Sequence, residues 1–375
     1  MTYKKLTIIT CFSYTGNRKY VFNPQYLRSD LRRIISFSQN RIGCALENTY
    51  VITDLCPTKE LQDEILNDFC NEVIKYLRDL GIFYGSYDVL YNMSPLKWLR
   101  NLCKQISPCC ERKANAIYDK VVNTILPIVR SSNVVEFVSL FTNFILVTGK
   151  THFDQTLENL FSQPISNLFF YYTGHGIRLW SDTQKRQRSY EICLVIPGTC
   201  SSAEFYSRQD LQKRFNQIIN RIPSFIVFDC CHAETILEFP FKMTFSNETD
   251  DLYISNTPCQ TNNLGSVYLS STRNNQTCGF YISNLGQYGG SLFTYHLIHF
   301  LDDIAKRRIT SRKRNILDLS RLREVEEQVQ EYRKLAEKKP QNISIGLSED
   351  STTQFPLWLF DNIASPRFQL VEEDE

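Results

Sequence analysis

Two stretches of the sequence carry a histidine and a cysteine at positions from which they could act on a substrate. In SNLFFYYTGHG an apolar run leads into His175, which lies between Gly174 and Gly176. In RIPSFIVFDCCHAET a second apolar run leads into Cys231. Glycine lets the backbone turn sharply and lets a substrate come close. A histidine and a cysteine that each follow a predicted strand suggest nucleophilic catalysis by a thiolate.

The spacing of His175 and Cys231 fits a peptidase. Cys231 lies 56 positions after His175, close to the roughly 50 positions that separate the catalytic pair in caspases. An imidazole beside the thiol would generate the thiolate and then protonate the leaving amine. The backbone amides of Gly176 and Cys231 would hold the oxyanion of the intermediate. Either side chain alone is more often structural, so the prediction depends on their pairing.

A parallel sheet is needed to position these two residues, and the sequence predicts one. Short apolar runs alternate with amphipathic segments of helical period, which indicates an α/β fold with a mainly parallel sheet of about six strands and helices on both faces. The carboxyl ends of such strands are where ligands bind. Two segments, 50–54 and 144–148, are alternatives for the second core strand. The predicted strands are 6–11, 50–53, 168–172, 192–196, 225–228 and 267–270, and the predicted helices are 27–37, 61–80, 153–161, 207–219 and 292–301.

One long segment interrupts this alternation. From about 81 to 143 the sequence changes to helical segments rich in Asn, Lys and Arg, which predicts a helical insertion. The residues on either side, 1–80 and 144–365, then form a single domain. The last residues, 366–375, are polar and acidic, and we expect a flexible tail there.

The two stretches around His175 and Cys231 resemble those of metacaspases, a family of caspase-like cysteine peptidases. That family has a Tyr-Ser-Gly-His-Gly histidine motif and an Asp-x-Cys-His nucleophile motif, and the matching residues here read YTGHG and DCCH. The resemblance implies a caspase-like three-layer sandwich, with Cys231 as the nucleophile and His175 as the acid and base. Cys230 fills the variable position and would face the core. Further similar segments are LRSD at 27–30, SSTRNNQTCG at 270–279, GGSLFT at 289–294 and PQNISI at 340–345.

The resemblance also implies a preference for basic side chains at P1, the substrate residue before the cleaved bond. Metacaspases of this type bind that side chain with acidic residues, and the matching positions are Asp30 and Asp229, with Thr173 where the family usually has Ser. An arginine or lysine would form charge-assisted hydrogen bonds with these carboxylates. Arg178 and Arg273 leave a caspase-like preference for aspartate open. The two aspartates also have structural alternatives, as a helix-start carboxylate and a strand-end ion pair.

The sequence gives little support for a bound metal. Many metacaspases bind activating calcium through an acidic cluster after the histidine strand, whereas the loop here reads SDTQKRQRSYE. That loop offers too few oxygen ligands for Ca²⁺. His296 and His299 lie on one predicted helix face, which is more often a half-buried surface than a metal site. We therefore expect no metal and no cofactor, and calcium dependence is in doubt.

Composition narrows the cellular setting and the partners. A formal net charge of +2 gives no general attraction to nucleic acid or to acidic membranes, and no apolar run is long enough to span a bilayer. Thirteen cysteines without an export signal predict reduced thiols in the cytoplasm. We expect a monomer that acts on protein or peptide substrates, without nucleic acid or membrane partners. The alternative is a non-catalytic caspase-fold decoy or scaffold whose insertion recruits a partner.

Overall fold

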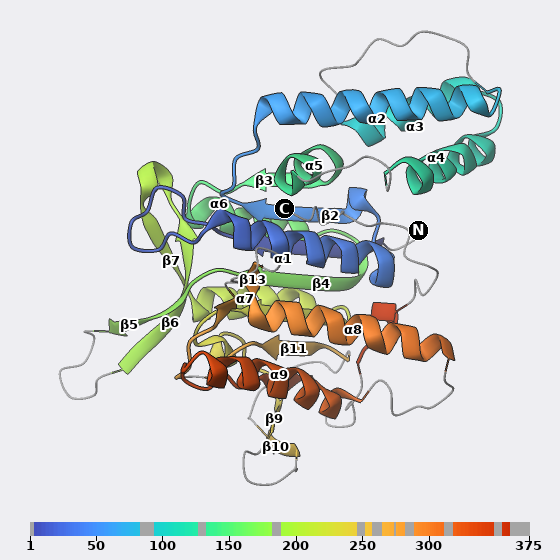
Figure 1. Cartoon of the computed structure of the whole chain (residues 1–375). Coiled ribbons are helices and arrows are strands. Elements are labelled where there is room, and N and C mark those ends of the chain that lie inside the picture. Colours follow the sequence, from blue (N-terminus) through green and yellow to red (C-terminus); the bar gives the residue numbers. More distant parts are fainter. Residues whose placement is uncertain are drawn as a thin grey trace.

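A large mixed sheet runs through the middle of the molecule (Figure 1). The computed structural model describes residues 4–82, 94–126, 133–181, 189–245, 252–256, 265–273, 275–281, 289–310, 318–348 and 355–360. Within these residues the sheet has nine strands, in the order β10-β9-β14-β11-β8-β4-β1-β2-β3. They are β1 (Lys4–Cys11), β2 (Thr49–Thr53), β3 (Asn143–Leu146), β4 (Ile165–Thr173), β8 (Ser224–Asp229), β9 (Phe241–Phe245), β10 (Leu252–Asn256), β11 (Val267–Ser270) and β14 (Ser344–Leu347).

The strands from β11 to β3 are parallel and form the core of the sheet. Both alternatives for the second core strand are present, since β2 lies beside β1 and β3 follows as the edge strand. The sheet is larger than the predicted six or so strands because β14, β9 and β10 extend it in antiparallel pairing. β9 reads FKMTF and is only half buried, so its apolar pattern is too weak to indicate a core strand.

The predicted strand at 192–196 is a strand but lies outside this sheet. It forms the middle of β6 (Ser189–Pro197), which pairs antiparallel with β5 (Gly176–Ser181) and β7 (Ala203–Ser207) in a separate sheet. Its apolar residues are buried in the same cluster as helix α7 (Arg208–Ile219). An apolar run buried in this way has the same sequence pattern as a parallel core strand. A further small sheet pairs β12 (Phe280–Tyr281) with β13 (Gly290–Ser291).

Helices cover both faces of the large sheet, which gives three layers as predicted (Figure 1). Ile9 of β1 belongs to the apolar cluster that contains α1 (Pro24–Phe37), α8 (Leu292–Thr310) and α9 (Leu322–Leu335). Ile8 belongs to the cluster that contains α6 (Lys150–Phe161) and α7. Neighbouring strand residues point to opposite faces, so each strand contributes to both clusters. The arrangement is consistent with a caspase-like sandwich. The helices of these layers are α1 (Pro24–Phe37), α6 (Lys150–Phe161), α7, α8 (Leu292–Thr310) and α9 (Leu322–Leu335), and the short helices are the π-helix η1 (Ser38–Ile42) and the 3-10 helices η2 (Leu46–Asn48), η3 (Thr199–Ser201), η4 (Ala233–Thr235), η6 (Leu319–Arg321) and η7 (Leu357–Phe360).

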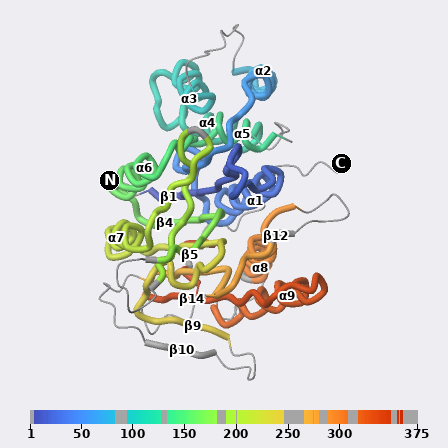
Figure 2. The backbone as a smooth tube through the Cα atoms, turned by 90° about the vertical axis from the view of Figure 1, so that its left-hand side faces the viewer, coloured from blue at the N-terminus to red at the C-terminus, as the bar shows by residue number. Residues whose placement is uncertain are grey.

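A further group of helices lies beyond the β3 edge of the sheet. It contains α2 (Lys59–Asp79), α3 (Pro95–Ile106), α4 (Glu111–Ile125) and α5 (Val134–Phe141), gathered together in Figure 1 and Figure 2. The segment predicted as a helical insertion, 81–143, supplies α3, α4 and α5. Helix α2 precedes that segment but packs against α4 and α5. The domain boundaries remain predictions, and the predicted tail at 366–375 lies outside the described residues.

No helix in the described part of the chain is long and apolar enough to cross a membrane.

Candidate active site

The strands that lead into His175 and Cys231 lie side by side in the centre of the sheet. β4 pairs with β8 in a register that sets Thr173 opposite Asp229, so the chain leaves both strands at the same carboxyl edge. Just beyond that edge the two backbones touch. A Cβ built on Gly176 would lie 2.0 Å from the carbonyl oxygen of Cys231, and a glycine is therefore required there. The structure thus brings the segments that carry His175 and Cys231 into contact.

The His175 ring is held by aromatic side chains and by one backbone carbonyl. It stacks on Phe22 with 4.0 Å between ring centroids and contacts Tyr14 at 5.1 Å. Nε2 lies 2.8 Å from the carbonyl oxygen of Tyr20. A carbonyl oxygen only accepts, so Nε2 carries the hydrogen of the neutral ring and Nδ1 is left as the basic nitrogen. Burial lowers the pKa of His175, which favours this neutral form.

The Cys231 thiol accepts a hydrogen bond from a backbone amide. The amide nitrogen of Cys278 lies 3.3 Å from Cys231 Sγ. Burial raises the pKa of Cys231, and the bond from Cys278 opposes that shift. Cys230, the preceding residue, is fully buried in the apolar core, as the resemblance implied. The resting pair is therefore a protonated thiol and a neutral imidazole.

A strained turn follows the cysteine and is held by the segment after β11. His232 has φ 59°, a left-handed conformation that is rare for residues other than glycine. Its amide donates to the carbonyl of Gln276 at 3.2 Å. Thr272 Oγ1 accepts from the amide of Ala233 at 3.1 Å and donates to the carbonyl of Cys230 at 2.9 Å. These contacts fix the backbone on both sides of Cys231.

The three residues predicted for the P1 pocket are close together and fully buried. Asp30, Thr173 and Asp229 each have 0% exposure. Both oxygens of Asp229 already have partners: Oδ2 accepts from Thr294 Oγ1 at 2.6 Å, and Oδ1 accepts from Cys278 Sγ at 2.8 Å. The Asp229 carboxylate is thus covered by two side chains of this chain itself.

Asp30 also has internal partners. Its Oδ2 accepts from the Ser291 amide at 2.8 Å, and its Oδ1 pairs with Arg33 Nη1 at 3.2 Å. The same Arg33 nitrogen donates to the carbonyl of Gly289 at 3.0 Å. Burial raises the pKa of Asp30 to about 8, Arg33 opposes this shift, and the neighbouring Asp229 adds to it. Two carboxylates and one guanidinium therefore share a buried space.

Sequence reasoning missed several of the residues that shape this site. Arg33 lies one helical turn after Asp30 on α1, and this spacing is a signal that could have indicated the ion pair. Thr294 and Cys278 belong to segments already matched to metacaspases. The carbonyl of Tyr20 gave no signal, because every residue has one.

The other residues singled out from the sequence have separate roles in the structure. Arg178 bonds Asn275 and lies over the ring of Tyr190 at 4.4 Å. Arg273 donates to the carbonyl of Phe245 at 2.6 Å. Residues 182–188 of the loop considered for calcium lie outside the described residues. Across the described part of the chain, no group of three or more His, Cys, Asp or Glu side chains could hold a metal ion.

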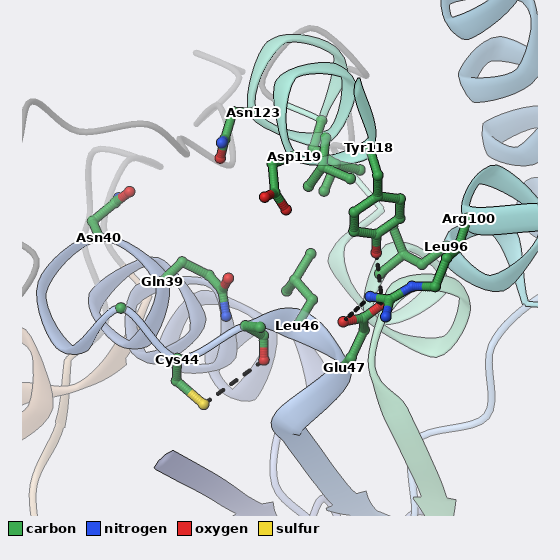
Figure 3. Close-up of a pocket in the computed structure, with 14 residues that line it drawn as sticks. Gln39, Asn40, Cys44, Leu46, Glu47, Leu96, Arg100, Tyr118, Asp119 and Asn123 are labelled. Carbon is green, nitrogen blue, oxygen red and sulfur yellow. Dashed lines mark hydrogen bonds and ion pairs between the residues drawn. The ribbon is translucent and has the colours of Figure 1, made fainter. Parts of the chain in front are cut away.

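A separate cavity of about 280 Å³ lies between η1, η2 and the helices α3 and α4 (Figure 3). Its wall contains an ion pair, in which Arg100 Nη2 contacts both oxygens of Glu47 at 2.6 and 2.9 Å. Tyr118 donates to Glu47 at 2.6 Å. Glu47 precedes β2, so the cavity lies at the amino ends of the parallel strands, opposite the edge that carries His175 and Cys231.

Comparison with known proteins gives a partial similarity. No family model matches the chain. Metacaspase-2 and metacaspase-3 of Trypanosoma brucei brucei are each 29% identical to it over 86 residues, which is 23% of this chain and 24% of each relative. The chain therefore aligns with about a quarter of the length of these relatives. Among solved structures, protein GSU0716 of Geobacter sulfurreducens aligns over 95% of this chain and 98% of its own, with 8% identity and a TM-score of 0.40. The similarity to metacaspases, which are cysteine peptidases, is compatible with a hydrolase.

Proposed function

We propose that this chain is a cysteine endopeptidase of the metacaspase type, which cleaves peptide bonds after arginine or lysine. The observation that carries the proposal is the hydrogen bond from His175 Nε2 to the Tyr20 carbonyl at 2.8 Å. The next residue, Gly176, is in backbone contact with Cys231. This bond leaves Nδ1 as the nitrogen that can take a proton from the thiol. The partial similarity to metacaspases supports the same function.

In the proposed reaction His175 Nδ1 takes the proton of Cys231, and the thiolate attacks the substrate carbonyl. The amides of Gly176 and Cys231 donate to the oxyanion. His175 then gives the proton to the leaving amine, and water hydrolyses the acyl-enzyme. Because burial raises the pKa of Cys231 and lowers that of His175, the free site keeps the proton on the thiol.

The proposed P1 pocket contains Asp30, Asp229 and Thr173. With Arg33 included, the pocket holds two carboxyl groups and one guanidinium. Asp30 keeps its proton below a pKa of about 8, and a basic substrate side chain would favour its ionised form, so that two carboxylates face two cations. An aspartate side chain would instead add a third carboxylate to a fully buried space, which is strongly unfavourable. Arginine or lysine at P1 is therefore the substrate that this pocket favours.

We further propose that the peptidase works without a metal or cofactor, as a monomer in the cytoplasm. The cysteines whose side chains the structure describes are free thiols, which suits a reducing compartment. Its substrates would be proteins or peptides, with no role for nucleic acid or a membrane.

Covalent labelling with an arginyl chloromethyl ketone tests the function. We expect a single adduct on Cys231, mapped by peptide mass spectrometry, and no adduct in Cys231→Ala. Cys109→Ser serves as the matched control, because it removes an exposed thiol between α3 and α4 and should leave the adduct on Cys231. A wild-type protein that is folded but takes up no label would contradict the proposal and favour the non-catalytic scaffold.

A further inference from the structure

A second thiol lies beside the proposed nucleophile and has no part in the peptidase reaction. The amide of Cys278 donates to Cys231 Sγ at 3.3 Å, although 47 residues separate the two in the chain. The Cβ of a cysteine is only two bonds from its own amide nitrogen. The Cys278 side chain therefore starts within a few ångströms of Cys231 Sγ. To reach disulfide geometry its sulfur has to turn from Asp229 Oδ1 toward Cys231.

Cys230 is the other thiol next to Cys231, and its orientation is wrong for pairing. It is 0% exposed and belongs to the apolar cluster that contains α6 and α7. A Cβ built on Gly176 would lie 3.2 Å from its sulfur, so Cys230 fills the space behind the backbone contact. Cys278 is thus the better partner for Cys231.

The surroundings of Cys278 could assist its reaction. Its Sγ donates to Asp229 Oδ1 at 2.8 Å, and this bond adds to burial in raising the pKa of the Cys278 thiol. Ser271 Oγ at 3.6 Å and Gln341 Nε2 at 3.8 Å donate toward the same sulfur. Such donors stabilise a thiolate once it forms. Asp229 therefore holds the resting thiol in its protonated form, and two donors are in place for the thiolate once it forms.

We propose that Cys231 and Cys278 form a reversible disulfide when the protein meets a peroxide. In the first step Cys231 Sγ attacks one peroxide oxygen, which gives a sulfenic acid and one water for hydrogen peroxide. In the second step Cys278 Sγ attacks the sulfenic sulfur, the S–S bond forms, and the hydroxyl leaves as water with the proton from Cys278. Two thiols are oxidised and one peroxide is reduced to two waters.

The disulfide would have two consequences at the site. It would remove the attacking thiol, and it would take the Cys278 sulfur away from Asp229. It would also protect Cys231 from further oxidation to the sulfinic acid, which ordinary thiols cannot reverse. Because burial raises the pKa of both thiols, we expect the reaction to be slow at neutral pH and faster at higher pH.

The test uses the full-length protein and does not depend on peptidase activity. The protein is treated with hydrogen peroxide, the remaining thiols are alkylated, and a digest made without reductant is analysed by mass spectrometry. We expect a cross-linked peptide that joins Cys231 to Cys278 and disappears after dithiothreitol. The same cross-link should form in Cys230→Ser. In Cys278→Ser, Cys231 should instead pass to the sulfinic acid at least several-fold faster than in the wild type.

Three results would overturn the proposal. The first is a disulfide between Cys231 and a different cysteine, and the second is sulfinic acid that forms at Cys231 equally fast in the wild type and in Cys278→Ser. The third is that Cys231 is not oxidised at all. The wild-type cross-link alone is decisive if a variant fails to fold. A protein that forms the cross-link but cleaves no peptide would refute the proposed peptidase and leave the disulfide intact.

Discussion

The proposed catalytic pair and the proposed P1 pocket lie at the same edge of the sheet but are held by different kinds of contact. His175 and Cys231 are partly buried, and each has a main-chain partner, the Tyr20 carbonyl for one and the Cys278 amide for the other. Asp30 and Asp229 are fully buried, and each has at least one side-chain partner.

This difference indicates which part of the site depends on the side chains of other residues. Main-chain groups are present whatever the residue, so these two hydrogen bonds of the proposed catalytic pair persist when side chains change, whereas the stacking of His175 on Phe22 does not. The pocket depends on Arg33, Thr294 and Cys278, any of which a substitution would alter. In this structure those side chains are already bonded to the carboxyl groups. A basic substrate side chain therefore has to displace at least one of these three side chains.

The largest effect should come from the main-chain contact at the catalytic pair. In Gly176→Ala the new Cβ would lie 2.0 Å from the Cys231 carbonyl, so one backbone must move. We expect kcat/KM on an arginyl peptide to fall by about 100-fold or more, with a loss of about 2–4 kcal/mol in unfolding free energy.

Gly265→Ala is the control for this change. Nothing lies within 4 Å of the added Cβ there, although φ is +64°, so we expect about 1 kcal/mol of destabilisation and unchanged activity. Activity retained in Gly176→Ala would show that the contact does not position the pair.

A smaller effect should come from the pocket. Arg33→Met removes the internal cation from Asp30 and leaves that carboxylate for the substrate. We expect KM for an arginyl peptide to fall by about 3- to 10-fold, because the substrate no longer competes with Arg33. Arg41→Met is the matched control, since Arg41 is a buried arginine whose Nε pairs with Asp302 at 2.6 Å and has no contact with the pocket. If KM does not fall in Arg33→Met, Arg33 maintains the structure of the pocket and does not compete with the substrate.

A further effect is expected on the pH dependence of stability. Asp30 has a pKa of about 8 in the folded protein and near 3.9 in the unfolded chain. Between these values the folded protein keeps a proton that the unfolded chain has lost, so stability falls as pH rises, by up to about 1.4 kcal/mol per pH unit. Urea unfolding at pH 5, 6 and 7 should show a weaker slope for Asp30→Asn than for the wild type. Equal slopes would mean that Asp30 is ionised and fully paired with Arg33.

Much of the fold could be predicted from the sequence because its signals are local. Buried parallel strands such as β8 read as continuous apolar runs, and their carboxyl ends meet at one edge. That rule alone brings the segments of His175 and Cys231 together. The separate sheet of β6 could not be told from the core, because its apolar run has the same pattern.

The contacts that complete the site had no comparable signal. The bond between His175 and the Tyr20 carbonyl joins residues 155 positions apart, and the bond from the Cys278 amide to Cys231 joins residues 47 positions apart. Both use backbone atoms that every residue has. Only the three-dimensional arrangement of the loops shows which carbonyl and which amide take these places.

The most direct test of the proposed function is the P1 preference of the protein, measured with a peptide library that varies only at P1. We predict that the wild type cleaves after arginine and lysine, and that Asp229→Asn loses most of this cleavage while Cys231 still reacts with iodoacetamide. Preferred cleavage after aspartate, or an arginine preference unchanged in Asp229→Asn, would contradict the central claim.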